Sequence, residues 1–258
     1  MNRPIVFGHR GASGYEIENT IPSFQLAVKM NADAVELDAQ LTSDEEVIVF
    51  HDFSLNRLFN VNKRISELRL IELSQYVFDA DRDVRIPSLE DIFKAIGHKI
   101  TINIELKLED GKDSKAGLLC KKVYGLIREY DLLKYVIISS FNINALKEVR
   151  MLSKDIRLGV LAESINTADE SAENSLRFYI KLASELNAGC INMLYSYADK
   201  QLISKLHANG LKGNVFTVNN DDLIIELLHN GVDGFFTNYP DRAIAAIQHD
   251  IGLNNPGT

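Results

Sequence analysis

The stretch PIVFGHRGASGYEIENTIPSFQLAVKMNADAVELDA, residues 4–39, contains one complete repeat of the pattern that decides the fold. A short apolar run of strand type, 5–9, is followed by a glycine-containing loop and then by a segment of helical period, TIPSFQLAVKMN. A second short apolar run, 34–39, comes next. This order predicts a strand, a helix and a second strand, which is the unit that builds parallel sheets.

The same alternation continues along the chain. Strands are predicted over residues 5–9, 34–39, 101–107, 136–141, 157–163, 189–194, 214–219 and 234–238. Segments of helical period lie between them. Eight such strands, mostly apolar, predict a (β/α)8 TIM barrel, for which about 250 residues are typical. A doubly wound open sheet is the alternative, but no GxGxxG motif follows the first strand.

The regular spacing breaks between residues 40 and 87. SDEEVIVFHD, 43–52, predicts a turn and a short extra strand, and an irregular stretch follows up to Pro87. We interpret approximately residues 53–86 as a small insertion at the top of the barrel, after the second strand. We therefore expect a single TIM-barrel catalytic domain over residues 1–251, with a flexible tail at 252–258.

Composition and charge narrow the class of function. Hydrophobic residues make up 46% of the 258 residues and charged residues 25%, which is typical of a globular protein with a sizeable core. The formal net charge of −8 disfavours nucleic acid as a partner, because binding to a phosphate backbone needs a clustered basic surface. The two cysteines, Cys120 and Cys190, lie in apolar patterns and indicate neither a disulfide framework nor a thiolate metal site.

Targeting signals are not recognisable in the sequence. The first ten residues contain no apolar signal core, and no stretch approaches ~18 uncharged apolar residues. We therefore expect a cytoplasmic protein without stable membrane insertion. The oligomeric state is left open.

Two of the predicted strands carry carboxylates on one face. In AVELDA, 34–39, the alternation of side chains puts Glu36 and Asp38 on the same face, and in TINIELK, 101–107, it puts Glu105 on the polar face. If the aliphatic faces pack beneath the helices, three carboxylates point into the barrel mouth, where they repel one another unless a cation neutralises them. A hard divalent ion, Mg²⁺ or Ca²⁺, suits such an all-oxygen set. The alternative is a solvated strand end with ordinary ion pairs.

Two histidines and two cations lie at corresponding strand ends. His9 ends the first strand and His51 the short extra strand. Each can be a metal ligand or a general acid or base, because imidazole changes its charge near neutral pH. Arg10 offers a donor fork that suits a phosphate, and Lys107 adds a positive charge beside Glu105. Together with a metal these groups indicate phosphate chemistry, although salt bridges to the carboxylates are the alternative for the two cations.

Several motifs resemble, in order and spacing, those of the glycerophosphodiester phosphodiesterase family. They are HRGASGYEIENTIPSF, VELDAQLTSDEEVIVFHD, IPSLEDIF, INIELK, FTVN and DGFFTNYPD, and they extend over about residues 5–243. The resemblance implies a β/α barrel with a small insertion after the second strand. It also implies hydrolysis of a glycerophosphodiester to sn-glycerol 3-phosphate and an alcohol. By family analogy, the glycerol 2-hydroxyl attacks phosphorus, and water then opens the cyclic phosphate.

The resemblance implies roles for the residues of the mouth. Glu36, Asp38 and Glu105 would bind Mg²⁺ or Ca²⁺. His9 and His51 would be the general acid and base, and the sequence does not decide which of them starts as the base.

Further roles are implied around these groups. Arg10 and Lys107 would hold the phosphate, and Glu18 would join or support the metal cluster. Phe216 would form an apolar wall where the family usually has Trp, and Asn238 stands where Asp is common. These departures affect the expected substrate preference more than the expected activity.

Other functions are less consistent with the sequence. A phosphatidylinositol-type phospholipase C or a lysophospholipase D needs access to lipid, and we find no basic amphipathic helix or exposed apolar run for docking to a membrane. A non-catalytic phosphodiester-binding barrel would not need two imidazoles together with three carboxylates. An aldolase-like Schiff base at Lys107 would need a lowered lysine pKa, which the neighbouring Glu105 would raise instead. A small, soluble glycerophosphodiester is therefore the expected substrate.

Overall fold

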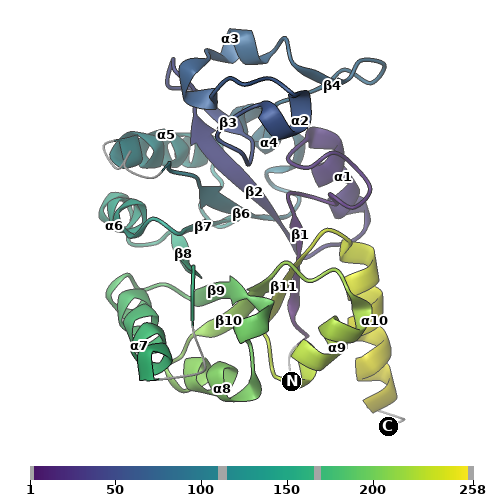
Figure 1. Cartoon of the computed structure of the whole chain (residues 1–258), viewed down its shortest axis with the longest axis vertical. Coiled ribbons are helices and arrows are strands. Elements are labelled where there is room, and N and C mark those ends of the chain that lie inside the picture. Colours follow the sequence, from purple (N-terminus) through teal and green to yellow (C-terminus); the bar gives the residue numbers. More distant parts are fainter. Residues whose placement is uncertain (1–2, 110–114, 166–169, 255–258) are drawn as a thin grey trace.

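A closed barrel of parallel strands forms the centre of the molecule (Figure 1). The structure is a computed structural model that describes residues 3–109, 115–165 and 170–254. Within these residues the barrel strands follow one another in the order β1, β2, β6, β7, β8, β9, β10 and β11, and β11 returns to pair with β1. The predicted TIM barrel is confirmed, and this closure excludes the open sheet.

The barrel strands coincide closely with the predicted ones. Their bounds are Ile5–His9 (β1), Ala34–Leu41 (β2), Thr101–Leu106 (β6), Val136–Ser140 (β7), Arg157–Ala162 (β8), Cys190–Leu194 (β9), Lys212–Phe216 (β10) and Gly234–Thr237 (β11). The largest difference is in β10, which was predicted over 214–219. The chain leaves the β10 direction after Phe216, and the backbone N–H of Val218 donates to Phe236 of β11 instead.

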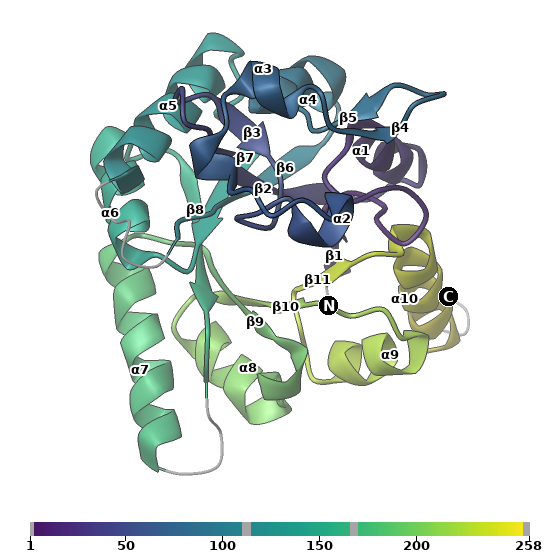
Figure 2. The ribbon, with the colours of Figure 1, turned by 45° about the horizontal axis from the view of Figure 1, so that its top comes forward.

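Helices cover the outside of the barrel (Figure 2). Their bounds are Ile21–Lys29 (α1), Leu89–Ile96 (α4), Ala116–Glu129 (α5), Ile143–Leu152 (α6), Glu170–Glu185 (α7), Lys200–Ala208 (α8), Asp221–His229 (α9) and Pro240–Asn254 (α10). Ser88, Asn142 and Asp199 each cap a helix by accepting a hydrogen bond from a backbone N–H of its first turn. Among the described residues, no helix is both long and apolar enough to span a bilayer.

The end of α10 bears on the predicted tail. The helix continues to Asn254, so the first three residues of the segment 252–258 are helical. The remaining four lie outside the described residues.

The aliphatic faces of β2 and β6 pack beneath the helices, as predicted. Val35 and Leu37 of β2, and Ile102 and Ile104 of β6, belong to one buried cluster with the inner faces of the surrounding helices. Since side chains alternate along a strand, the residues between them point to the interior of the barrel. The acidic side chains are placed there as a consequence.

The segment between β2 and α4 forms a small unit with its own apolar cluster, at the top of Figure 1. It contains β3 (Val47–Val49), α2 (Asn56–Phe59), a 3₁₀ turn (Ile65–Glu67), α3 (Leu70–Leu73) and the hairpin of β4 (Val77–Asp79) and β5 (Val84–Arg85). β3 pairs antiparallel with the outer end of β2. The segment is more regular than the irregular stretch that was predicted, because elements of two to four residues are too short to show a period.

Candidate active site

The register of three neighbouring strands gathers the acidic side chains. His9 of β1 is paired with Glu36 of β2, which is paired in turn with Asn103 of β6. Two residues further along these strands, Asp38 is paired with Glu105. Side chains at paired positions project to the same side of the sheet. One carboxylate oxygen from each of Glu36, Asp38 and Glu105 lies within 4.8 Å of the others. The predicted trio therefore forms one cluster at the carboxyl ends of the strands.

Amide and cationic groups surround this cluster. Asp38 is 1% exposed and accepts a hydrogen bond of 2.8 Å from Nδ2 of Asn19. Nε of Arg10 lies 3.4 Å from Oδ2 of Asp38. Nζ of Lys107 lies 3.0 Å from Oε1 of Glu105 and 3.7 Å from Oδ1 of Asp38. Both predicted phosphate-binding cations are thus at the mouth, in contact with the acids.

The charges of the three acids are unequal. Burial raises the pKa of Glu36 well above its usual value and that of Glu105 to about 7, and the negative charge of Asp38 adds to both shifts. Burial acts in the same direction on Asp38, but Lys107 and Arg10 hold its pKa below the usual value. The cluster therefore does not ionise fully without more positive charge. Its buried, all-oxygen donor set fits a hard divalent cation.

The loop after β1 positions Arg10 through an unusual backbone. Arg10 has a φ of 55°, in the left-handed region, and its backbone N–H donates to Oε2 of Glu36 at 2.9 Å. Gly11 follows with a φ of 87°, and a Cβ there would lie 2.4 Å from Oγ of Ser23 in α1. Only glycine fits this approach. The loop is thus folded tightly between the strand end and α1.

His9 is held by a neutral partner. Its Nδ1 lies 2.8 Å from Oδ1 of Asn238, and its Nε2 lies 4.0 Å from Oε2 of Glu36. With the amide oxygen facing the ring, Nδ1 carries the proton and Nε2 is free to accept one. Burial and, to a smaller extent, the positive charge of Arg10 lower the pKa of His9 to about 4. The imidazole is therefore neutral at pH 7.

Gln40 fixes the backbone on both sides of His51, and Asp52 contacts its ring. Nε2 of Gln40 donates to the carbonyl oxygens of Phe50 at 2.6 Å and of Asp52 at 2.9 Å. Nδ1 of His51 lies 2.6 Å from Oδ1 of Asp52. Although burial opposes its ionisation, Arg57 and His51 hold the pKa of Asp52 below its usual value, so Asp52 is a carboxylate that accepts a hydrogen bond from Nδ1–H of His51. Burial lowers the pKa of His51.

These groups line a cavity of about 210 Å³ with a polar and an apolar side. His9, Arg10, Glu36, His51, Asn103, Glu105 and Lys107 form the polar side. Phe141, Leu161, Phe216 and Phe236 face them from the other strands. The Phe216 ring meets Phe141 and Phe236 edge-on, with centroids 6.1 and 6.4 Å away. Phe216 thus lies in the apolar wall where it was expected.

Glu18 does not join the acidic cluster. Its carboxylate accepts hydrogen bonds from Arg10 and Arg57. It therefore supports the cluster indirectly, through the arginine that contacts Asp38.

Four residues that hold this site were not predicted from the sequence: Asn19, Gln40, Asp52 and Arg57. Gln40 is two residues after Asp38 on the same face of β2, and this spacing was a usable signal. Asn19 and Asp52 lie within the motifs already quoted. Arg57 contacts Glu18 across 39 residues of sequence, so no local pattern could have found it.

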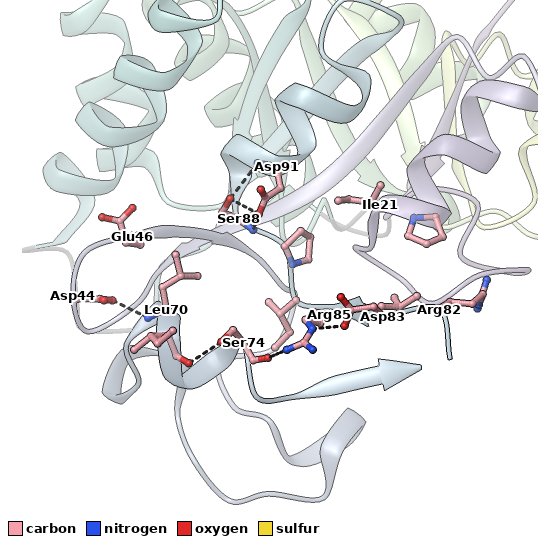
Figure 3. Close-up of a pocket in the computed structure, with 15 residues that line it drawn as sticks. Ile21, Asp44, Glu46, Leu70, Ser74, Arg82, Asp83, Arg85, Ser88 and Asp91 are labelled. Atoms are coloured by element: carbon pink, nitrogen blue, oxygen red, sulfur yellow. Dashed lines mark hydrogen bonds and ion pairs between the residues drawn. The ribbon is translucent and has the colours of Figure 1, made fainter. Parts of the chain in front are cut away.

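A larger hollow of about 760 Å³ lies away from the barrel mouth, between the insertion and the starts of α1 and α4 (Figure 3). Its charged side chains are engaged with nearby groups. Arg85 donates to Asp83 and to the carbonyl of Ser74, and Asp91 pairs with Ser88. No group of clustered acids and imidazoles occurs among the described residues that line it. The barrel mouth is therefore the candidate active site.

Comparisons with known proteins identify the family of the chain. The glycerophosphoryl diester phosphodiesterase family model matches residues 9–242. The chain is 33% identical over 250 residues to YhdW of Bacillus subtilis, with 95% of this chain and 98% of YhdW covered. It is 31% identical over 260 residues to the glycerophosphodiester phosphodiesterase of Caldanaerobacter subterraneus, with 95% of this chain and 98% of that protein covered.

A solved structure extends the comparison to three dimensions. An Oleispira antarctica phosphodiesterase in complex with the product sn-glycerol-3-phosphate has a TM-score of 0.83 and 27% identity, covering 95% of this chain and 97% of that one. The fold and the matches together define a phosphodiesterase of the TIM-barrel class. The chain belongs to the glycerophosphoryl diester phosphodiesterase family, and its activity is that of a glycerophosphodiester phosphodiesterase.

Proposed function

We propose that this enzyme hydrolyses soluble glycerophosphodiesters to sn-glycerol 3-phosphate and an alcohol, with a divalent metal and with His9 and His51 as the groups that move protons. The observation that carries the proposal is the cavity in which both imidazoles stand beside buried carboxylates and two cations. The product bound to the Oleispira antarctica phosphodiesterase supports the same reaction.

The acidic cluster is the proposed metal site. Glu36, Asp38 and Glu105 would hold the ion, and their oxygen donors favour Mg²⁺ or Ca²⁺. When bound, the ion would neutralise part of the negative charge of the phosphoryl group.

The cations and the apolar wall would bind the substrate. Nε of Arg10 is buried and makes no hydrogen bond among the described residues, although it lies 3.4 Å from Oδ2 of Asp38, and it would donate to a phosphoryl oxygen. Lys107 would contribute a second positive charge. Phe141 and Phe216 would contact the carbon atoms of the glycerol or alcohol.

The partners of the two imidazoles suggest the direction of proton transfer. His9 faces a neutral amide, so its Nε2 would accept the proton of the glycerol 2-hydroxyl as that oxygen attacks phosphorus. His51 faces a carboxylate, which stabilises the imidazolium, so it would donate a proton to the leaving alcohol oxygen as the P–O bond breaks. A water molecule would then open the cyclic phosphate, giving its proton to His51 while His9 returns its own to the 2-oxygen.

The test is release of sn-glycerol 3-phosphate from glycerophosphocholine, glycerophosphoethanolamine and glycerophosphoglycerol. The purified protein would be assayed before and after EDTA, with Mg²⁺, Ca²⁺ or Mn²⁺ added back. We expect release that EDTA abolishes and a divalent ion restores. Activity confined to lysophospholipid micelles would favour a lysophospholipase D instead, and activity that resists EDTA would contradict the metal requirement.

A further inference from the structure

We propose that Arg57 is a positioning residue for two groups of the proposed catalytic centre. It holds His51 in place through Asp52, and it holds Arg10 in place through Glu18. The inference rests on the proposed function, in which His51 moves a proton and Arg10 binds phosphate. Arg57 itself does not line the cavity. It lies in α2, within the insertion.

The guanidinium of Arg57 binds two carboxylates that come from different parts of the chain. Its Nε donates to Oδ2 of Asp52 at 2.6 Å. Its Nη2 donates to Oε1 of Glu18 at 2.6 Å, and its Nη1 to Oε2 of Glu18 at 3.0 Å. Asp52 follows β3, whereas Glu18 lies in the loop after β1. A planar fork of donors can satisfy both acids at once, which an ammonium group cannot do with the same geometry.

Each of these two carboxylates also contacts a residue that lines the cavity. Oδ1 of Asp52 lies 2.6 Å from Nδ1 of His51. Oε1 of Glu18 also accepts from Nη1 of Arg10 at 2.9 Å. His51 and Arg10 are thus joined by a continuous chain of charged hydrogen bonds, with Arg57 as its central member. The side chains of Glu18 and Asp52 are only 19% and 22% exposed, so solvent screens these contacts incompletely.

A second arginine of the insertion provides a matched control. Nε of Arg82 donates to Oδ2 of Asp79 at 2.7 Å, and its Nη1 donates to both carboxylate oxygens of Glu16 at 2.9 and 3.0 Å. Arg82 therefore also ties the insertion to the loop after β1, and it is as exposed as Arg57, at 50% against 45%. Within the described residues, neither Glu16 nor Asp79 lines the cavity. Loss of Arg82 removes a docking contact alone, whereas loss of Arg57 removes the support of His51 and Arg10.

Steady-state kinetics on a glycerophosphodiester at saturating metal would test the inference. The proteins to compare are the wild type, Arg57→Ala, Arg57→Lys and Arg82→Ala. We expect Arg57→Ala to lower kcat about 10- to 100-fold and to raise KM, because small misplacements of reacting groups are costly. Arg57→Lys would recover only part of this loss, and free guanidinium ion would raise the kcat of Arg57→Ala. Arg82→Ala would stay within about twofold of the wild type, since a surface ion pair contributes little.

A measurement that does not need turnover separates this inference from the proposed function. The ¹⁵N signals of the His51 ring report which nitrogen carries the proton. At a pH where the ring is neutral, we expect its single proton at Nδ1 in the wild type and in Arg82→Ala, and a mixture of the two tautomers in Arg57→Ala.

The inference would be overturned if Arg57→Ala matched Arg82→Ala in both kcat and ring spectrum. If Arg57→Ala did not fold, Arg57→Lys and Glu18→Gln would be compared with Arg82→Ala in the same way, and equal results would again reject it. An inactive wild type, or a fully active His51→Ala, would contradict the proposed function, while the ring spectra would still decide whether Arg57 holds His51.

Discussion

His9 and His51 are the same kind of residue in two different settings. Nδ1 of His9 donates to a neutral amide and that of His51 to a carboxylate, so a proton added to the ring is better stabilised on His51. The partner of His9 is Asn238, which is 229 positions away in the sequence, whereas the partner of His51 is the adjacent residue, Asp52. This difference in partners is the basis for proposing His9 as the first base and His51 as the first acid.

Removal of either imidazole should abolish turnover without unfolding the protein. We expect His9→Ala and His51→Ala each to lower kcat at least about 100-fold, the usual contribution of general acid–base catalysis. Their side chains are 19% and 32% exposed and lie outside the apolar core, so thermal midpoints should change little. His229→Ala, a change at an exposed histidine of α9, is the control and should leave kcat unchanged. A normal rate in either active-site variant would remove that residue from the mechanism.

Glu105 should make the free energy of unfolding of the metal-free protein depend on pH. Its folded-state pKa of about 7 lies above the value of about 4.3 expected in the unfolded chain. Between these values the folded protein keeps a proton that the unfolded chain has released, so the free energy of unfolding falls as pH rises through this window.

The isosteric variant tests this linkage. We expect Glu105→Gln to raise the thermal midpoint of the metal-free protein at pH 8 and to reduce the further rise caused by Mg²⁺ or Ca²⁺. Glu129→Gln, at the exposed end of α5, should do neither. An unchanged metal effect in Glu105→Gln would show that Glu105 is not a ligand.

At the scale of single elements, β2 contributes most to the site. Its inward face presents Glu36, Asp38 and Gln40 in succession, and its outer end pairs with β3, which leads into His51. The insertion is thus attached to the same strand that carries two of the acids. The imidazole of His51, the proposed acid, is brought to the mouth by this pairing.

The start of α4 fixes the point where the insertion returns to the barrel. Oγ of Ser88 accepts from the backbone N–H of Asp91 at 3.1 Å, and Oδ2 of Asp91 accepts from the backbone N–H of Ser88 at 3.0 Å. We expect Ser88→Ala to lower the free energy of unfolding by about 1 kcal/mol, measured by urea denaturation. Ser204→Ala, the same change inside α8, should stay within about 0.5 kcal/mol. Equal effects of the two changes would contradict the capping role.

At the scale of the whole molecule, one apolar cluster joins the helices to the outer face of the barrel. Cys120 of α5 lies within it, and Cys190 of β9 is buried inside the same barrel. Burial raises the pKa of both thiols to about 12, so neither should react in the folded protein.

The two thiols therefore report on cooperativity. We expect neither to react with a thiol reagent at pH 8 in the native protein, and both to become reactive over the same range of guanidinium chloride in which helical circular dichroism is lost. Reaction of one thiol at a lower concentration would show that its part of the barrel opens separately.

Most of the fold could be predicted from the sequence because the evidence for it is local. Side-chain alternation in AVELDA and TINIELK depends only on neighbouring residues, so the strands, their polar faces and the acidic trio were all visible. The family motifs pointed to the same residues. The short elements of the insertion were not visible, because so few residues carry no period.

Only the tertiary structure decided how these residues act together. Strand register places Asp38 beside Glu105. Folding of the insertion places Arg57 against Glu18, so Glu18 pairs with Arg10 and Arg57 and is not part of the acidic cluster. The different pKa values of the three acids, and the different partners of the two histidines, follow from burial and from contacts between distant segments. The sequence by itself determined which chemical groups face the barrel mouth, because alternation is local. Their distances, protonation and mutual support depend on long-range packing, which no local pattern encodes.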